Sequence, residues 1–511
     1  MKKIDNIKLA VGESEEKLLP KAAKIAHIPL NGVKHFKILK KSLDARDKNA
    51  LFYTYNVEIS VTEEVKQKPV YPKASGKAAV IGAGPCGLFC ALYLARCGIR
   101  PTVFERGCAV DERKQKTDLF ANGGALDPEC NIQFGEGGAG AFSDGKLNTQ
   151  VNNSLVKQVV EDFAAFGAPN EILYMAKPHI GSDKLPGVIR NIRKEIISLG
   201  GEFVFNAKVY DFAIKNGRLQ SVKYKKGGVE TEAFFDETVL AIGHSSRDTF
   251  ERLYSLGVSM EQKDFAVGFR VEHLQSDIGK AQYGEKYYKM LPAADYRLAS
   301  HAGERDVFTF CMCPGGYVMP AASEQGGVVV NGMSQYLRDG LNANSAIVCR
   351  VDKRDFIGDD ALGGVRFQRV LERKAYEFGG GDYKAPVQLV RDFLKNRLSA
   401  SFGAVKPSYP RGVTFAPLNE FFSAEITRSI AAAIIDMGKK IKGFDDGDGL
   451  FTATESRTSS PLRILRNEKC ESVNVEGLYP AGEGAGYAGG ITSAAADGIR
   501  VAFAIVNKHS I

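Results

Sequence analysis

Three glycines and one acidic residue have the spacing that is typical of dinucleotide-binding proteins. Gly82, Gly84 and Gly87 follow the apolar run of residues 78–81, and Glu105 follows a second apolar run, eighteen residues after Gly87. Such glycines let the backbone turn sharply and approach a pyrophosphate at a helix N-terminus. The carboxylate would accept hydrogen bonds from ribose hydroxyls. The pattern predicts a dinucleotide site, and two further residues are expected beside it: Pro85 and Arg106.

A second glycine-rich segment lies almost four hundred residues later. Gly482 and Glu483 follow an apolar run, and Gly490 and Ile491 precede a helical run over residues 492–506. In two-domain flavoproteins, a late glycine–acid pair meets the ribityl chain, and the next helix points its N-terminus at the isoalloxazine. A nicotinamide dehydrogenase needs no such return, because its dinucleotide domain is contiguous. The segment therefore favours FAD over NAD as the tightly bound cofactor.

Five longer motifs carry a family likeness: 135–147 (GEGGAGAFSDGKL), 178–185 (PHIGSDKL), 311–316 (CMCPGG), 455–460 (ESRTSS) and 482–490 (GEGAGYAGG). They resemble the signature of a bacterial family of largely uncharacterised FAD-dependent dehydrogenases. The likeness runs from about residue 30 to the C-terminus. More distantly, the layout is similar to glutathione-reductase-type flavoproteins. The resemblance implies FAD and a two-domain flavoprotein fold, and it implies no particular substrate.

The expected fold is α/β, with a Rossmann-like FAD-binding domain interrupted by an inserted α+β substrate domain. A small N-terminal α+β domain of ferredoxin-like type precedes it, joined by a linker over residues 66–76. The expected domain limits are as follows: 1–72 for the N-terminal domain, 73–250 for the first part of the FAD-binding domain, 251–443 for the insertion and 444–511 for the return segment.

Within the first part of the FAD-binding domain we expect a helix over residues 186–199 and a β-meander beginning at residue 207. Val209 would cover the adenine through backbone contacts, and Gly243 would end the strand on the adenine side. Residues 251–443 look irregular, with short strands and one long helix near residues 424–440. They contain no second dinucleotide fingerprint. A pyridine nucleotide, if used, would therefore bind transiently at the flavin without a dedicated Rossmann domain.

Residues 122–148 are glycine-rich and lack periodicity. They contain a second literal glycine match at 135–140, but no apolar strand leads into it, so we reject it as a nucleotide site. We expect instead a loop whose backbone passes close to the flavin, with three residues in contact range: Ser143, Gly145 and Lys146.

Few side chains need to be catalytic, because the flavin carries the hydride chemistry. Cys311 and Cys313 would share one face of a strand and pack as small hydrophobes; a redox or substrate-binding thiol is the alternative. No His or Cys pair nearby has metal-ligand spacing, so no metal site is expected. The histidines of the motif regions are expected to be structural rather than acid–base groups: His179, His244 and His301.

Glu455, Arg457 and Tyr487 are the candidate catalytic residues, since they lie where the chain returns to the flavin. Arg457 would hold an anionic substrate or stabilise negative charge on the flavin, with an Arg–Glu structural pair as the equal alternative. Tyr487 would stack over the ring or donate a proton.

Composition sets the remaining bounds. The 511 residues carry a formal net charge of +8, with 44% hydrophobic and 25% charged residues, as in ordinary globular proteins. Nine cysteines scattered along the chain fit a reducing compartment, and the charged N-terminus shows no signal peptide, so a cytoplasmic location is expected. Residues 78–95 are uncharged, but their glycines and proline argue against a membrane span.

These observations predict an FAD-dependent oxidoreductase that acts on a small organic substrate, with NAD(P)H as transient electron donor. One alternative is an RNA-modifying flavoprotein that docks through its basic N-terminal domain. The weak net charge and the absence of interleaved basic and aromatic residues make nucleic acid the lesser choice. The other alternative is a non-enzymatic protein with structural FAD. The sequence leaves the oligomeric state open.

Overall fold

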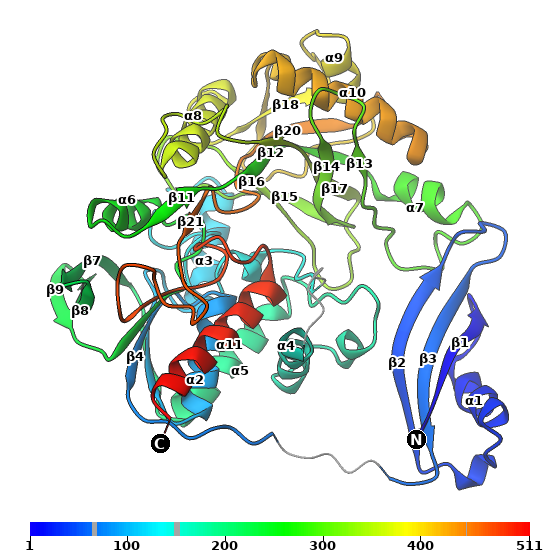
Figure 1. Cartoon of the computed structure of the whole chain (residues 1–511). Coiled ribbons are helices and arrows are strands. Elements are labelled where there is room, and N and C mark those ends of the chain that lie inside the picture. Colours follow the sequence, from blue (N-terminus) through cyan, green and yellow to red (C-terminus); the bar gives the residue numbers. More distant parts are fainter. Residues whose placement is uncertain (64–68, 148–153, 446, 511) are drawn as a thin grey trace.

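The chain forms a small N-terminal sheet, a parallel sheet and a larger seven-stranded sheet (Figure 1). The structure, a computed structural model, describes residues 1–63, 69–147, 154–445 and 447–510. The expected linker over residues 66–76 therefore lies partly outside the described residues. No helix among the described residues is long and apolar enough to cross a membrane.

The N-terminal module is an antiparallel sheet of order β1-β3-β2 with one helix, in a core that includes Leu9, Leu18 and Val57. Its elements are β1 (Lys2–Ala10), α1 (Leu18–Ala26), β2 (His35–Asp44) and β3 (Phe52–Ser60). A ferredoxin-like fold needs a second helix and a fourth strand, and the described residues of the module supply neither. The amide of Lys41 donates to the Tyr174 carbonyl at 2.7 Å, which ties β2 to the main body.

The parallel sheet contains the predicted strand, glycine turn, helix and strand. Its order is β22-β10-β4-β5-β6, and all four pairings are parallel. The strands are β4 (Lys77–Ile81), β5 (Arg100–Phe104), β6 (Glu202–Val204), β10 (Glu237–Leu240) and β22 (Leu478–Pro480). Its neighbouring helices are α2 (Pro85–Arg96), α3 (Val110–Ala121), α4 (Ser154–Ala165), α5 (Leu185–Ser198), α6 (Arg247–Ser255) and α11 (Ile491–Lys508).

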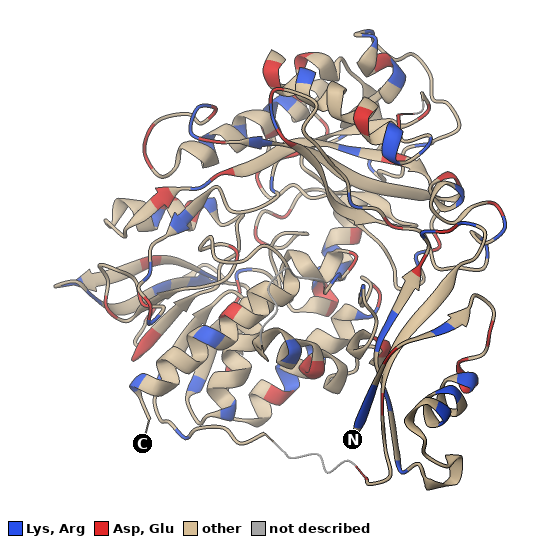
Figure 2. Ribbon diagram, turned by 45° about the vertical axis from the view of Figure 1, so that its right-hand side comes forward, with Lys and Arg blue, Asp and Glu red and all other residues tan. Residues whose placement is uncertain are grey.

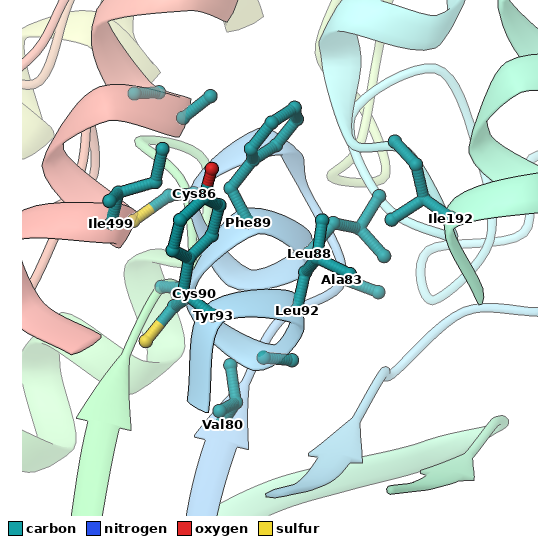
Figure 3. Packing of buried hydrophobic residues seen from close by; sticks show 14 of the residues in the cluster. Val80, Ala83, Cys86, Leu88, Phe89, Cys90, Leu92, Tyr93, Ile192 and Ile499 are labelled. Atoms are coloured by element: carbon teal, nitrogen blue, oxygen red, sulfur yellow. The ribbon is translucent and has the colours of Figure 1, made fainter. Parts of the chain in front are cut away.

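Helix α2 lies at the centre of this domain. Phe89 and Leu92 are buried in one cluster with Val80 of β4, Ile192 of α5 and Ile499 of α11 (Figure 3). Because α2 is apolar on every face, it packs between the sheet and helices that come from distant parts of the sequence. The return of the chain as β22 and α11 therefore completes the core as well as the sheet.

The expected meander forms a three-stranded antiparallel sheet: β7 (Ala207–Lys215), β8 (Arg218–Lys226) and β9 (Val229–Ala233). Nearby, Cys108 and Cys130 form a disulfide bond across 22 residues. The cysteine distribution predicted no disulfide framework, and this single pair was not anticipated. The other seven cysteines are free.

The insertion contains a seven-stranded sheet of order β13-β14-β17-β12-β20-β18-β19. The expectation of short, irregular strands was wrong, because β12 and β17 run ten residues each and pair along their whole length. The strands are β12 (Phe265–Leu274), β13 (Ala299–Ser300), β14 (Val307–Cys313), β17 (Asn342–Val351), β18 (Ala385–Leu389), β19 (Val413–Phe415) and β20 (Leu450–Glu455).

Strand β20 corrects the expected start of the return segment at residue 444. It pairs with β12 and β18 inside the seven-stranded sheet, so the chain leaves this sheet only after Glu455. The remaining helices are α7 (Gln275–Tyr283), α8 (Gly363–Gly379), α9 (Val390–Leu394) and α10 (Ala424–Lys440). Two short antiparallel pairs complete the domain: β15 (Tyr317–Pro320) with β16 (Val330–Met333), and β11 (Met260–Gln262) with β21 (Leu462–Ile464).

Candidate functional site

A cavity of about 360 Å³ is lined by residues of the parallel sheet, the glycine-rich loop and the seven-stranded sheet. It brings together three segments that the sequence analysis expected to converge: the loop ending at Lys146, residues 455–458 and residues 489–491. The insertion adds five residues to the lining: Phe310, Cys311, Val329, Val330 and Asn331.

The glycine turn between β4 and α2 forms one wall of this cavity. Gly82 has φ +102°, and a Cβ there would lie 2.4 Å from the Ala241 carbonyl oxygen. Gly84 and Pro85 line the cavity, and no side chain among the described residues caps α2. The free N–H groups of its first turn are thus available to an anion. Gly87 lies outside the lining; a Cβ there would meet the Gly82 carbonyl oxygen at 1.9 Å, so it serves helix packing.

The Glu105 carboxylate accepts hydrogen bonds from three backbone segments at the cavity wall. One carboxylate oxygen accepts from the Ala83 amide at 2.8 Å, and the other accepts from the Gly107 and Gly135 amides, each at 2.9 Å. An ionised carboxylate offers about four lone-pair sites, so one further donor such as a ribose hydroxyl fits. Arg106 also lines the cavity, but its guanidinium is already paired with Glu129 at 2.7 Å and Asp248 at 2.8 Å.

The fully buried Arg113 of α3 holds the glycine-rich loop in place. Its guanidinium donates to five backbone carbonyls, those of Asn131, Ile132, Gly135, Glu136 and Gly138, at 2.8–3.2 Å. A Cβ on Gly135 would lie 2.4 Å from the Arg113 side chain. One buried cation therefore fixes a segment that has little regular structure of its own.

The predicted contact residues of this loop all line the cavity. The Ser143 hydroxyl donates to the Gly140 carbonyl at 2.8 Å and accepts from the Gly145 amide at 3.1 Å. Lys146 is paired with Asp144 at 2.9 Å and donates to the Met312 carbonyl of β14. The loop thus reaches from the parallel sheet to the inserted domain.

Val209, Gly243, Glu483, Gly490 and Ile491 line the cavity as expected, whereas Gly482 does not. The Gly482 amide donates to Asp497 of α11 at 2.8 Å, and a Cβ there would meet Cys86 at 2.8 Å. No side chain among the described residues caps α11 either. Its N-terminus at Gly490 and Ile491 is therefore a second set of free N–H groups at the cavity wall.

Glu483 and His244 lie close together in the lining, with 4.0 Å between His244 Nε2 and Glu483 Oε1. Burial raises the pKa of the Glu483 carboxyl to about 7. Burial, together with the charges of Arg457 and Arg247, lowers the pKa of His244 to about 3, so the imidazole is neutral at neutral pH. The pair therefore offers one group that exchanges a proton near pH 7 beside one that stays uncharged.

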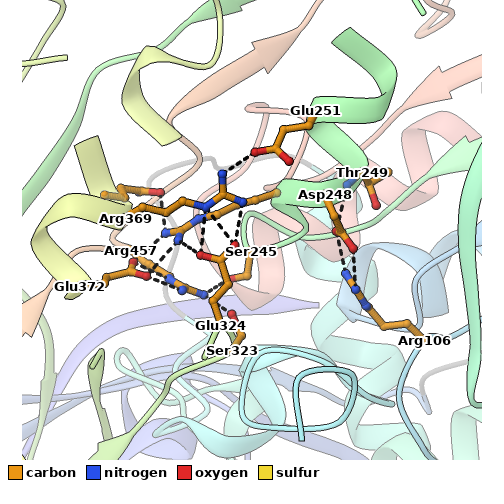
Figure 4. A network of polar contacts seen from close by, with 12 residues as sticks. Arg106, Ser245, Asp248, Thr249, Glu251, Ser323, Glu324, Arg369, Glu372 and Arg457 are labelled. Carbon is orange, nitrogen blue, oxygen red and sulfur yellow. Dashed lines mark hydrogen bonds and ion pairs between the residues drawn. The ribbon is translucent and has the colours of Figure 1, made fainter. Parts of the chain in front are cut away.

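Arg457 lines the cavity, but its donors are used by protein groups (Figure 4). Nε and Nη2 bind the Glu372 carboxylate at 2.9 and 2.7 Å, and Nη1 donates to Ser323 at 2.6 Å and Ser245 at 3.0 Å. This arrangement favours the structural interpretation of Arg457, with Glu372 of α8 as its partner. Glu455 instead pairs with the fully buried Arg270 of β12 at 3.1 Å.

Tyr487 lies outside the lining. Its hydroxyl donates to the Ile464 carbonyl at 3.1 Å and accepts from the Arg466 amide at 3.1 Å, and the Arg466 guanidinium stacks 3.7 Å from the ring centre. These contacts give it a structural role, so we do not carry forward its prediction as a residue over the flavin. Of the other histidines, His179 binds the Tyr336 carbonyl at 3.0 Å and His301 binds Asp306 at the surface.

Sequence reasoning missed three charged residues that organise the site: Arg113, Arg270 and Glu372. All three are at most 2% exposed, and their partners lie between 18 and 185 residues away in the sequence. In a single sequence they are indistinguishable from charged residues on a solvated surface. The described residues contain no group of three or more His, Cys, Asp or Glu side chains that could hold a metal ion.

A protein of Clostridium beijerinckii described as uncharacterised is 44% identical to this chain over 541 aligned positions, which cover 100% of this chain and 99% of that protein. The chain belongs to the family of that clostridial protein. Residues 264–458 match a family model described as FAD-dependent protein, C-terminal domain-like, and residues 1–60 match a domain of unknown function. Residues 264–458 are thus similar to an FAD-dependent protein domain, and FAD is the cofactor.

Solved flavoprotein structures resemble this chain more remotely. A flavin-dependent brominase is 13% identical, with 85% of this chain and 80% of that chain covered and a TM-score of 0.38. A geranylgeranyl bacteriochlorophyll reductase-like protein of Thermoplasma acidophilum is 10% identical, with 85% and 79% covered and a TM-score of 0.36. The distant likeness to glutathione-reductase-type flavoproteins stays a prediction.

The residues of the cavity fit FAD. Two helix N-termini without side-chain caps, those of α2 and α11, offer free N–H groups in its wall. Gly84 leaves open the space that a side chain would enter, since a Cβ there would meet only Gly138, at 3.7 Å. Glu105 retains capacity for a hydroxyl donor, and Val209 lines the same space. A dinucleotide with an anionic centre and hydroxyl-bearing sugars matches this set of groups.

Proposed function

We propose that this protein is an FAD-dependent oxidoreductase that binds FAD in the cavity and transfers electrons between a small organic substrate and NAD(P)H. In the proposed arrangement, the pyrophosphate lies at the N-terminus of α2, Glu105 binds the adenosine ribose and Val209 lies against the adenine. The flavin ring lies towards α11, near Gly490 and Ile491. When bound, FAD supplies the hydride chemistry, and the protein positions the reactants.

The observation that carries the proposal is that residues of both large sheets line one cavity. The glycine turn of the parallel sheet faces the same space as Cys311 and Glu455 of the seven-stranded sheet. Ligand sites are commonly found at such domain interfaces. A purely structural cofactor would need no lining from the inserted domain. This shared lining supports an enzyme over a protein in which FAD is only structural.

Glu483 is the group best suited to proton exchange in this reaction. Burial raises the pKa of its carboxyl to about 7, so both protonation states are populated near neutral pH. The neighbouring His244 imidazole stays neutral and adds no competing charge. The predicted role of Arg457 in binding an anionic substrate is not supported, because its guanidinium N–H groups already donate to Glu372, Ser245 and Ser323.

Anaerobic titration of the purified protein with NADH and with NADPH tests the proposal. We expect at least one of the two donors to bleach the flavin absorbance under anaerobic conditions. Photoreduction with EDTA serves as the control that the flavin can be reduced in place. Bleaching by light but by neither nicotinamide donor would contradict the proposed electron partner.

A further inference from the structure

The Cys-Met-Cys motif ends strand β14 in an irregular conformation. The register with β17 shifts between Phe310 and Cys313, and Cys311 has φ +44°. A bulge of this kind re-aims side chains that a regular strand would place on one face. Cys311 lines the cavity, while Cys313 is fully buried behind it. The expectation that both cysteines pack together as small hydrophobes on one strand face was therefore wrong.

Two cations, the half-buried Lys146 and the fully buried Arg270, donate hydrogen bonds to the carbonyls of this bulge. Lys146 donates to the Met312 carbonyl, and Arg270 Nη1 donates to the Cys311 carbonyl at 3.2 Å. Arg270 also binds Glu455 at 3.1 Å and Asn344 at 2.7 Å. Its Nη2 has no hydrogen-bond partner in the described parts of the chain. Within the described residues, Nη2 of this guanidinium is therefore an unused hydrogen-bond donor close to the sulfurs of Cys311 and Cys313.

The two cysteines lie within reach of each other. The Cys313 thiol donates to the Cys311 carbonyl oxygen at 3.3 Å. The nearby Cys313 side chain, as a hydrogen-bond donor, and the charges of Lys146 and Arg270 lower the pKa of Cys311 despite burial and the opposing carboxylate of Asp144. The pKa of Cys313 is raised, as expected for the donor of the pair. Two further carboxyl groups face Cys311: Glu455 and Glu483.

We propose that Cys311 and Cys313 are a redox-active pair that carries two electrons between the flavin and a disulfide substrate. The proposal rests on the oxidoreductase function proposed above and names its substrate class. A thiolate stabilised by two cations and exposed to the cofactor cavity is the form that attacks disulfides. Cys313, protonated and behind it, is the resolving thiol.

The electrons and protons balance in two steps. With reduced FAD bound as the source of two electrons and two protons, the sulfur–sulfur bond of the Cys311–Cys313 disulfide would break to give two thiols, and the flavin would be left oxidised. The Cys311 thiol loses its proton and attacks one sulfur of a substrate R–S–S–R, and the expelled RS⁻ takes up a proton to leave as the first thiol. Cys313 attacks Cys311 in turn, which re-forms the protein disulfide and releases the second thiol. The hydride donor of the nicotinamide class regenerates reduced FAD.

The first test is the alkylation state of the motif in the flavin-loaded protein. The protein is quenched with iodoacetamide before and after anaerobic reduction, and the peptide containing residues 311–313 is weighed. Before reduction, we expect an unlabelled peptide whose mass is two hydrogens below that of the peptide with two free thiols. After reduction, we expect the peptide to carry a label on both cysteines. Photoreduction with EDTA replaces NAD(P)H if neither donor bleaches the flavin, so this result does not depend on the proposed electron donor. A peptide labelled equally in both states would overturn the proposal.

The second test uses Cys311→Ser and Cys313→Ser with 5,5′-dithiobis(2-nitrobenzoate) as the disulfide probe. Both variants should keep their flavin and its bleaching by donor, yet lose catalytic reduction of the probe. Cys349→Ala is the matched control, since Cys349 is buried in the neighbouring strand β17, away from the cavity, and should keep full turnover. Unchanged probe reduction in both serine variants would refute the dithiol, while intact bleaching would leave the oxidoreductase proposal standing.

Discussion

Arg457 Nη2 lies 2.7 Å from Glu372 Oε2, and both groups are at most 3% exposed. Arg247 binds the same carboxylate from α6 at 2.6 Å. Burial would raise the pKa of Glu372, but the two guanidinium groups outweigh it and hold that pKa well below its usual range. A single carboxylate of α8 therefore joins α6 to the chain that leaves β20, directly beside the cavity.

The first prediction concerns this ion pair. Arg457→Ala should lower the free energy of unfolding by about 3 kcal/mol, because removing one partner of a buried pair leaves a charge poorly compensated. Arg457→Lys should recover only part of the loss, since an ammonium cannot make the two-pronged contact. Urea unfolding of the flavin-loaded protein measures both. Arg350→Ala is the control: its pair with Asp264 is largely exposed, and its effect should stay within about 0.5 kcal/mol.

The second prediction concerns Glu105. Glu105→Gln should weaken FAD binding by about 1.5–3 kcal/mol, because an amide cannot accept from all three backbone N–H groups that the carboxylate holds. Titration of the flavin-free protein with FAD, followed by fluorescence, measures the change. Glu112→Gln, an exposed substitution on α3, should leave the affinity unchanged. Equal affinities in the two variants would show that Glu105 has no part in the cofactor site.

These residues also show what a single sequence can predict. Gly82, Gly84, Glu105 and Glu483 line one cavity, and each belongs to a short contiguous signal in the sequence; their contacts with FAD stay predictions. Helix α10 was predicted over its whole length, because its 3.6-residue periodicity is regular. Strand β12 was missed because Arg270 and Glu272 interrupt its apolar pattern. Their partners Glu455 and Asn342 lie 185 and 70 residues away, beyond any local signal.

The third prediction concerns Arg113. Arg113→Met should destabilise the protein by about 3 kcal/mol or more, because several buried carbonyls of the glycine-rich loop lose their donor. Hydrogen exchange should show faster amide exchange in residues 131–138 than in the unsubstituted protein. Arg190→Met removes a partly exposed partner of Asp111 and should leave this segment protected. Slow exchange in Arg113→Met would mean that other contacts fix the loop.

The fourth prediction is a pH dependence set by Glu483. Its pKa in the folded chain, about 7, lies above the ordinary value of 4.5. The folded state therefore binds more protons than the unfolded state, and stability is lost as pH rises from about 4.5 to about 7. Glu483→Gln should remove this loss, which amounts to about 3 kcal/mol at most. Thermal unfolding of the flavin-free protein across that pH range checks it, and parallel curves for both proteins would contradict it.

The conformation of Cys311 could not be predicted from the periodicity of the sequence. Strand periodicity correctly places β14, but the bulge at Cys311 depends on Lys146 and Arg270, which come from other elements. The contacts of Tyr487 are likewise tertiary, since its hydroxyl is hydrogen-bonded to the backbone of Ile464 and Arg466. In both cases, contacts with other elements determine where the side chain lies, and the sequence of one strand or loop does not contain that information.

The flavin content of Gly84→Val tests most directly whether this cavity holds FAD. Gly84 has φ −73°, and a Cβ there would have ordinary contact distances, so the variant should fold. Its side chain would nevertheless enter the proposed pyrophosphate space. We predict a folded protein that purifies with little or no FAD, whereas Gly187→Val, where a Cβ meets nothing within 4 Å, should retain full occupancy. Full FAD occupancy in folded Gly84→Val would contradict the account.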